Sequence, residues 1–283
     1  MAVTTVAFIG LGAMGSGMAQ CLVRRGLTVR GYDTRHARLD ELAEFGVTPT
    51  RSSAEAAEGA DAAVVIVLTA DQAEDAVFGD LGLARSLRPG SVVVCSSTMA
   101  PARARSLAAR AGEAGLRWLD APVSGGTVRA ADGTLTTMVG ADAADLELAR
   151  PMLQAFSRDV FHLGPVGAGS TAKMVNQVLV FCNLAATAEA MTLCRKLGVD
   201  LQSVYDVIST AMGTSAIFES RVPKLIDGSY ASGGSMRIAL KDLGIVEEAA
   251  RELSVPMPMT SQATQLFRAA AASGELDGDD LAV

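Results

Sequence analysis

The chain has 283 residues, of which 49% are hydrophobic and 19% are charged, and its net charge is −7. This composition is typical of a soluble globular protein of one or two domains with a sizeable core. The acidic balance argues against nucleic acid as a partner. No segment reaches 18 consecutive apolar residues, so a membrane span is not expected.

Cysteine and histidine usage points to a reduced protein without a metal. The four cysteines have no CxxC spacing and lie in apolar periodic segments: Cys21, Cys95, Cys182 and Cys194. Buried thiols in the cytoplasm are the simplest interpretation, and the N-terminus reads as a strand, not as a signal peptide. Two histidines are too few for a His-rich metal site.

A short apolar strand over residues 4–9 opens the chain and leads into a glycine-rich turn. An amphipathic helix follows, and a second strand is expected over 27–32. GxGxxG between a strand and a helix lets a pyrophosphate approach the helix N-terminus. The sequence therefore predicts a dinucleotide-binding turn, made of Gly10, Leu11, Gly12, Ala13, Met14 and Gly15.

Asp33 follows the second strand, where an acid can accept hydrogen bonds from both ribose hydroxyls. Its charge would repel a 2′-phosphate, so NAD is favoured over NADP. Thr34 lies beside it in the expected cofactor site. Arg35 and Arg38 partly offset the repulsion, so the use of NADP stays open.

Strands and helices continue to alternate through the first half of the chain. We expect strands over 62–68, 91–95, 116–119 and 135–139, and helices over 70–87 and from Pro101. This alternation indicates an α/β fold with a mostly parallel, doubly wound sheet. Ligands of such sheets bind at the carboxyl ends of strands, where Thr69, Thr98 and Asp120 fall.

A glycine pair follows the strand that ends at Asp120, within the stretch DAPVSGG. Gly125 and Gly126 expose backbone N–H groups, and Ser124 and Thr127 add hydroxyls. This combination suits a carboxylate ligand. A plain Pro/Gly turn explains the same residues equally well.

One helix of about 28 residues, roughly 42 Å long, is expected from Ser170 to Leu197, because no proline or glycine interrupts it. Ser170 or Thr171 is suited to cap its start. Apolar residues recur at steps of three and four and predict a buried stripe. This stripe comprises Met174, Val178, Phe181 and Ala185.

Lys173, Asn176 and Gln177 lie in the first turns of this helix, and their spacing places both amides on the face of the lysine. A lysine beside two amides at a glycine-flanked helix start suits proton transfer. The alternative from the helix alone is a solvated lysine with polar neighbours.

Beyond Leu197 the pattern is helical, with a helix over 236–253. Breaks are expected at Gly213, 223–228, Gly233-Gly234 and Pro256/Pro258. The change from strands to helices predicts two domains. They are an NAD-binding Rossmann domain at 1–164 and an all-α domain for substrate and oligomerisation at 165–283.

Four ordered motifs then resemble one family, the β-hydroxyacid dehydrogenases, which include 3-hydroxyisobutyrate dehydrogenase, tartronate semialdehyde reductase and L-threonate dehydrogenase. The motifs are GLGAMGSGMA at Gly10, DAPVSGG at Asp120, GAGSTAKMVNQ at Gly167 and KDLG at Lys241. The resemblance implies a Rossmann domain joined by a long helix to an all-α domain like that of 6-phosphogluconate dehydrogenase. It also implies NAD(P)-dependent hydride transfer to or from a small hydroxy acid.

The resemblance further implies roles for residues. Lys173 would be the catalytic acid/base, and Asn176 would contact the substrate and position that lysine. The substrate carboxylate would bind at Ser124, Gly125 and Gly126. The second amide departs from the family's usual asparagine, since it is Gln177.

The resemblance also implies contacts to the nicotinamide and to the substrate from other parts of the chain. Lys241 would reach in beside the nicotinamide, and Thr98 would contact the cofactor near that ring. Phe218 would lie over the substrate, within a stretch, AIFESRVPKLIDGSY, that looks more like threonate dehydrogenases. Asp33-Thr34-Arg35 stands where NADPH-dependent members carry Asn-Arg-Thr, which supports NAD.

Three other functions fit parts of the chain: an imine reductase, a non-catalytic NAD-binding protein and a structural protein. Lys173 argues against the second, and glycine turns at strand ends argue against the third. The long helix carries more apolar surface than a small helical domain covers, so a homodimer or homotetramer built through 164–283 is expected.

Overall fold

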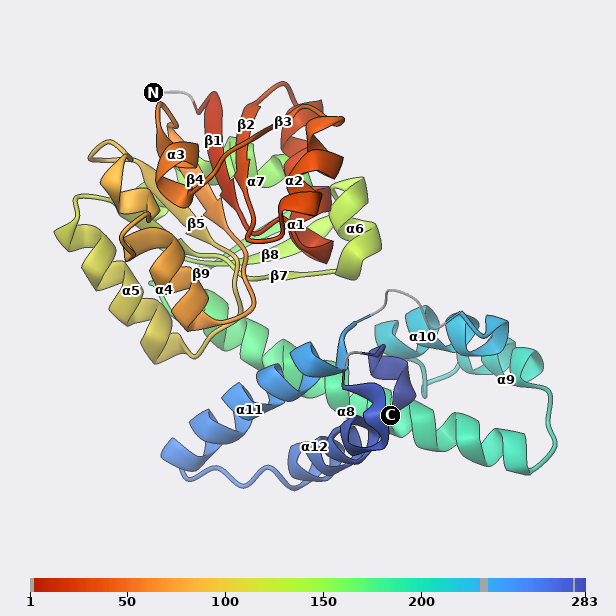
Figure 1. The fold of residues 1–283 in the computed structure, drawn as a ribbon. Helices are drawn as coiled ribbons and strands as arrows, with labels where there is room; N and C mark the ends of the chain where they lie inside the picture. Colours follow the sequence, from red (N-terminus) through yellow and green to blue (C-terminus); the bar gives the residue numbers. More distant parts are fainter. Residues whose placement is uncertain (1–2, 230–233, 277) are drawn as a thin grey trace. The chain divides into compact units, whose positions relative to one another are not determined.

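A computed structural model describes residues 3–229, 234–276 and 278–283. The chain divides into two compact units, Met1–Lys173 and Met174–Val283. The first consists of a sheet with helices on both faces, and the second consists of helices (Figure 1).

The sheet of the first unit has the strand order β3-β2-β1-β4-β5-β6-β8-β7, and β9 pairs with β8. Strands β1 to β6 are parallel, whereas β8 runs antiparallel to β6 and β7. The predicted α/β doubly wound fold is confirmed. The strands are β1 (Thr5–Ile9), β2 (Thr28–Tyr32), β3 (Val47–Pro49), β4 (Ala62–Val65), β5 (Val92–Cys95), β6 (Arg117–Asp120), β7 (Val123–Ser124), β8 (Leu135–Gly140) and β9 (Ser157–Gly164).

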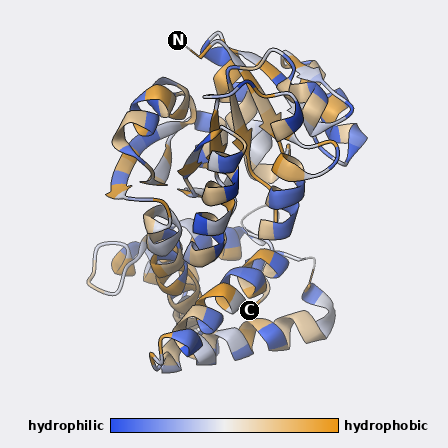
Figure 2. Ribbon diagram, turned by 90° about the vertical axis from the view of Figure 1, so that its left-hand side faces the viewer, coloured by the Kyte–Doolittle hydropathy of each residue, from blue (hydrophilic) through white to orange (hydrophobic). Residues whose placement is uncertain are grey.

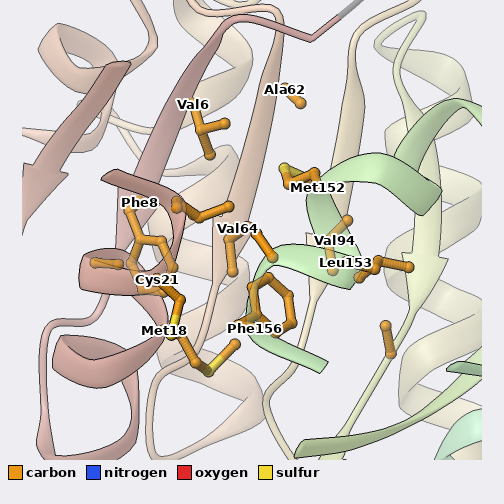
Figure 3. Packing of buried hydrophobic residues seen from close by; sticks show 14 of the residues in the cluster. Val6, Phe8, Met18, Cys21, Ala62, Val64, Val94, Met152, Leu153 and Phe156 are labelled. Carbon is orange, nitrogen blue, oxygen red and sulfur yellow. The ribbon is translucent and has the colours of Figure 1, made fainter. Parts of the chain in front are cut away.

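Alternate side chains of the central strands enter two separate cores, because successive residues of a strand point to opposite faces. Val6 and Phe8 of β1 pack in one core, and Ala7 and Ile9 pack in the other. Figure 3 shows the first core, where β1, β4 and β5 meet α1 and α7. The helices are α1 (Ala13–Arg24), α2 (His36–Ala43), α3 (Ser53–Ala57), α4 (Ala70–Phe78), α5 (Pro101–Glu113), α6 (Gly126–Asp132) and α7 (Ala143–Phe156).

Some local predictions differ from the structure. The helix expected over 70–87 ends at Phe78, and a short 3₁₀ turn, η1, follows at Leu83–Arg85. Gly79 and Gly82 separate the two, since both adopt extended backbone. Strand β9 was not predicted because its sequence, SRDVFHLG, mixes polar and apolar residues without alternation.

The second unit is built around α8 (Ala168–Lys196), which begins in the first unit and continues here. Its earlier turns pack against α11 and α12 through Phe181 and Phe267, whose rings meet edge to face at 5.4 Å. Its later turns pack against α9 and α10. Figure 2 shows hydrophobic residues in orange between hydrophilic residues in blue along these helices. The remaining elements are α9 (Leu201–Ile208), α10 (Ala216–Asp227), α11 (Met236–Glu252), α12 (Pro258–Ala270), η2 (Ala271–Glu275) and η3 (Asp280–Ala282).

Within the described part of this unit no strand occurs beyond an isolated bridge between Ser235 and Asp279, in agreement with the predicted all-α region. The break expected at Gly233 and the end of the threonate-like stretch at Tyr230 lie outside the described residues. Helix α8 is long and apolar enough, by length and composition, to cross a membrane, although core helices of soluble proteins meet the same criterion.

The start of α8 corrects one prediction. The helix begins at Ala168, before either expected capping residue. The Ser170 hydroxyl donates to Asp120 and the Thr171 hydroxyl donates to the Gly167 carbonyl. Both hydroxyls therefore act as donors and do not cap the helix. The Asp120 carboxylate accepts the N–H groups of Gly167 and Ser170 at the helix start.

Candidate cofactor and substrate site

The glycine-rich turn after β1 has the shape that a pyrophosphate needs. Gly10 has a φ of +94°, and a Cβ there would lie 2.1 Å from the Ile66 carbonyl oxygen. A Cβ on Gly15 would lie 1.9 Å from the Gly10 oxygen. Gly12 caps α1, and a Cβ on it would meet only the Arg35 guanidinium, at 3.3 Å. The first and third glycines thus allow close packing, and the second leaves the helix N-terminus accessible to a phosphate.

Asp33 lies at the end of β2 with 7% of its surface exposed. The Leu11 N–H donates to one carboxylate oxygen at 2.8 Å, and the Arg35 N–H donates to the other at 2.8 Å. Burial opposes ionisation, but these hydrogen bonds and the Arg35 side chain outweigh it and lower the pKa of Asp33. The carboxylate is therefore charged at neutral pH and able to accept ribose hydroxyls. Thr34 beside it is exposed.

The two threonines predicted at strand ends follow β4 and β5. The Thr69 hydroxyl accepts the Gln72 N–H at 3.1 Å, and the Gln72 side chain accepts the Thr69 N–H, a capping box that starts α4. Thr98 is half-buried in the segment that leads to α5. Both lie at carboxyl ends of parallel strands, as predicted.

The stretch around Ser124 is a tight turn between β7 and α6. Gly125 has a φ of +140° and Gly126 a φ of +70°, which side chains rarely adopt. A Cβ on Gly125 would also lie within 3.0 Å of Arg129 and Leu135. Ser124 pairs with Thr136 across the β7–β8 ladder. Both glycines are therefore required by the backbone itself.

Asp120 ties the end of β6 to the start of α8. Its carboxylate, with 2% of the residue exposed, accepts the Gly167 N–H at 3.0 Å, the Ser170 N–H at 2.8 Å and the Ser170 hydroxyl at 2.6 Å. Burial raises the pKa of Asp120, and the Ser170 and Gly167 hydrogen bonds and the Arg105 charge oppose that rise. Lys173, one turn further along, is 8% exposed. The sequence located Asp120 at a strand end but did not predict this link.

A chain of side chains joins α8 to α11 within the second unit. The Asn176 amide donates to the Gln177 oxygen at 2.9 Å, and the Gln177 amide donates to Asp242 at 2.6 Å. The Lys241 ammonium lies 2.8 Å from the other Asp242 oxygen. Three predicted residues are thus brought together by Asp242, which is 2% exposed and had no predicted role.

Phe218, which the resemblance predicts over the substrate, belongs to an apolar cluster of this unit. Its ring stacks on Tyr205 at 5.7 Å, packs with Met191 and Cys194 of α8, and is 4% exposed. Met191 is about 21 Å along the helix from Gln177 at 1.5 Å per residue. Packing of the apolar faces of α9 and α10 against α8 explains this position.

Two family models together cover nearly the whole chain. Residues 5–164 match the NAD binding domain of 6-phosphogluconate dehydrogenase, and residues 167–283 match the NAD-binding domain of NADP-dependent 3-hydroxyisobutyrate dehydrogenase. L-threonate dehydrogenase of Cupriavidus necator is 42% identical over 279 residues, which are 98% of this chain and 94% of that protein. The chain belongs to the β-hydroxyacid dehydrogenase family.

Other members agree with this assignment. The crystal structure of 3-hydroxyisobutyrate dehydrogenase from Salmonella typhimurium superposes with a TM-score of 0.91 at 38% identity and covers 98% of each chain. The NAD-dependent L-serine dehydrogenase of Pseudomonas aeruginosa is 38% identical, over 97% of this chain and 94% of that protein. This β-hydroxyacid dehydrogenase is therefore an NAD(P)-dependent oxidoreductase that acts on a small hydroxy acid.

An imine reductase from Myxococcus stipitatus is 21% identical with a TM-score of 0.68 and covers 98% of each chain. At that identity it shares the fold alone. The imine reductase and non-catalytic alternatives are not favoured, because the more similar relatives are dehydrogenases of hydroxy acids.

Proposed function

We propose that this enzyme uses Lys173 as the general acid/base in the oxidation of a short hydroxy acid. The observation that carries the proposal is the placement of Lys173. It is 8% exposed and lies one turn beyond a helix start that Asp120 fixes through three hydrogen bonds. A positioned amine that is shielded from bulk water can exchange a proton directly with a bound alcohol, whereas a solvated lysine exchanges its proton with water.

The other residues bind and orient. Bound nicotinamide supplies hydride chemistry. Ser124, Gly125 and Gly126 hold the substrate carboxylate, and Lys173 accepts the alcohol proton during oxidation. Asn176, Gln177 and Lys241 order the substrate side of the site. Two hydrogen bonds restrain the amides through Asp242, and an ion pair with the same carboxylate restrains Lys241.

We further propose that NAD is preferred over NADP. The Asp33 carboxylate, with its lowered pKa, repels a 2′-phosphate. The comparison to make is kcat/KM for each cofactor at one substrate concentration. A tenfold or greater preference for NADP would contradict the proposal and would indicate that Arg35 binds the phosphate.

For the substrate, we propose a polyhydroxylated four-carbon acid of the threonate class. Several similar relatives are L-threonate dehydrogenases, whereas others act on L-serine or 2-(hydroxymethyl)glutarate. The experiment is NADH formation with L-threonate, other tetronates, 3-hydroxyisobutyrate and L-serine. Tetronates should give the highest kcat/KM. A higher value with 3-hydroxyisobutyrate would remove the threonate assignment and leave the family unchanged.

We propose functional domains at 1–164 for the cofactor and 165–283 for substrate and oligomerisation, in a cytoplasmic enzyme. The two family matches meet between residues 164 and 167, and the compact units divide after Lys173. The turn at Gly10 supports the cofactor role of the first part, which also carries the proposed carboxylate site at Ser124, and the α8–α11 contacts support the substrate role of the second.

A homodimer or homotetramer is proposed from one face of α8. Val175, Leu179, Leu193 and Leu197 are 57%, 59%, 60% and 70% exposed. Leu193 comes 18 residues after Val175, which is five helical turns, so the four side chains share one stripe. A second copy of the same helix would bury this stripe.

Light scattering of the purified protein tests the assembly. The double variant Leu179→Glu with Leu193→Glu should shift the population toward the 29.1 kDa monomer. Leu81→Glu, at a residue that is 67% exposed in the first unit, is the matched control and should leave the assembly unchanged. A wild-type protein that is monomeric at micromolar concentration would contradict the proposal.

A further inference from the structure

Arg129 of α6 lies against the turn that is proposed to hold the substrate carboxylate. Its Cβ and Cδ would be 2.9 and 3.0 Å from a Cβ on Gly125, so the aliphatic stem packs directly on that glycine. Its guanidinium donates to the Thr134 carbonyl oxygen at 2.8 Å and to the Thr136 hydroxyl at 3.3 Å. The side chain is therefore fixed at its stem by packing and at its guanidinium by two hydrogen bonds.

Thr136 relates this guanidinium to Ser124. The two residues are directly opposed in the antiparallel β7–β8 pair. Opposed residues of such a pair point to the same face of the sheet, with Cβ atoms about 4.5–5.5 Å apart. Because the guanidinium contacts the Thr136 hydroxyl, it lies on the face that carries the Ser124 hydroxyl.

The chemistry of this position suits an anion. The chain has a net charge of −7, so a small carboxylate needs a local cation to enter the site. Arginine stays charged at all relevant pH values and presents a planar fork that matches a carboxylate. A neutral donor could also reach the Thr134 carbonyl, so that hydrogen bond by itself does not require a positive charge.

We propose that Arg129 is a substrate-binding residue that supplies the positive charge for the hydroxy-acid carboxylate beside Ser124. This inference rests on the proposed function and deepens it. It limits the substrate to acids whose carboxylate binds at the Ser124 turn, with the reacting alcohol directed toward Lys173.

The experiment compares Arg129→Gln, Arg129→Lys and Arg150→Gln with the wild type, with L-threonate and NAD as the probes. Glutamine keeps a donor for the Thr134 carbonyl but loses the charge, and lysine keeps the charge but loses the fork. Arg150 pairs with exposed Glu147 on α7 and is the control for a lost surface charge. The measured quantities are kcat, KM for threonate at low and high salt, and NADH affinity by fluorescence.

We expect Arg129→Gln to raise KM for threonate about tenfold or more, with kcat within threefold and unchanged NADH affinity. The rise of KM with salt should weaken, since a screened attraction has been removed. Arg129→Lys should raise KM about threefold, and Arg150→Gln should behave as the wild type.

Equal KM values in Arg129→Gln and Arg150→Gln would overturn the inference. So would a loss of kcat and NADH affinity without a change in KM, which identifies a structural brace. If the glutamine variant does not fold, the lysine variant decides by the same split between KM and kcat. If the wild type oxidises neither L-threonate, other tetronates, 3-hydroxyisobutyrate nor L-serine, the proposed function is overturned, and this inference with it.

Discussion

Buried carboxylates are held in different ways in the two units. In the first, Asp33 and Asp120 accept backbone N–H groups of the segments that they fix, the turn after β1 and the start of α8. In the second, the side chains of Gln177 and Lys241 hold Asp242, and the side chain of Arg221 holds Asp280. Each carboxylate is 7% exposed or less.

The difference has a physical consequence. A carboxylate bound to backbone N–H groups fixes the path of the chain, and the donors cannot be moved by rotation of a side chain. One bound to side chains fixes only those side chains, and it leaves the helices that carry them in place. We therefore expect changes in the first unit to affect folding, and changes in the second to affect the order of substrate-binding groups.

The largest effect should come from Lys173, which lies one turn beyond the anchor that Asp120 provides. Lys173→Ala should lower kcat by about 10² to 10⁴-fold, because positioned proton transfer is lost. Lys173→Arg should also fail, since a guanidinium does not release its proton near neutral pH. NADH binding, measured by fluorescence, should change little because the turn at Gly10 is intact. An alanine variant that keeps a third of the wild-type kcat would exclude Lys173 from the mechanism.

Asp120→Asn tests the backbone anchor. The amide oxygen can still accept the Gly167 and Ser170 N–H groups, and the Ser170 hydroxyl can turn to accept from the amide nitrogen. The charge that strengthens all three hydrogen bonds is lost, however, so a loss of about 2 kcal/mol in the free energy of unfolding is expected. Denaturant unfolding measures it. Asp242→Asn is the matched control, since both aspartates are 2% exposed. Equal losses in the two variants would contradict the distinction between the units.

Local patterns predicted the first unit well. GLGAMG, the apolar strands and the positions of Asp33 and Asp120 are all readable within short windows, because parallel strands end at one edge of a sheet. The partner of Asp120 is Ser170, fifty residues later, and no periodicity connects the two.

The second unit was predicted only as helices. Gln177 and Asp242 are 65 residues apart, and their contact depends on how α11 packs against α8. Phe218 was expected over the substrate from the resemblance to relatives, and its stacking on Tyr205 depends on tertiary packing that no local pattern shows. Arg129 had a local signal, because it is a cation about one helical turn after the glycine pair Gly125-Gly126.

The pH dependence of stability offers a third test, at Asp280. Burial raises the pKa of Asp280 to about 6, while Arg221 opposes the rise. In the unfolded chain the carboxyl ionises near pH 4. The folded state therefore binds more protons between about pH 4 and 6, so the contribution of Asp280 to stability falls as pH rises through that window.

Asp280→Asn removes this titration. The free energy of unfolding of the variant, minus that of the wild type, should increase between about pH 4.5 and 7 by about 2 kcal/mol. Asp227→Asn, at an exposed residue near the end of α10, should show no such trend. A difference that is constant with pH would show that Asp280 keeps an ordinary pKa in the folded protein.

The smallest effect is expected at Asp242, where the side-chain contacts of the second unit meet. Asp242→Asn keeps an oxygen that can accept the Gln177 amide but loses the charge that holds Lys241. We expect kcat/KM to fall about tenfold, with a stability loss of about 1 kcal/mol or less, because α8 and α11 still pack through Phe181 and Leu243.

A double-mutant cycle with Lys241→Met separates the two contacts of Asp242. If the carboxylate acts by holding Lys241, Asp242→Asn should have little further effect once the lysine is gone, and the coupling between the two changes should be large. If it acts through Gln177, the loss in kcat/KM should be the same in both backgrounds. The second outcome would mean that the amide pair, and not the lysine, is what this buried carboxylate orders.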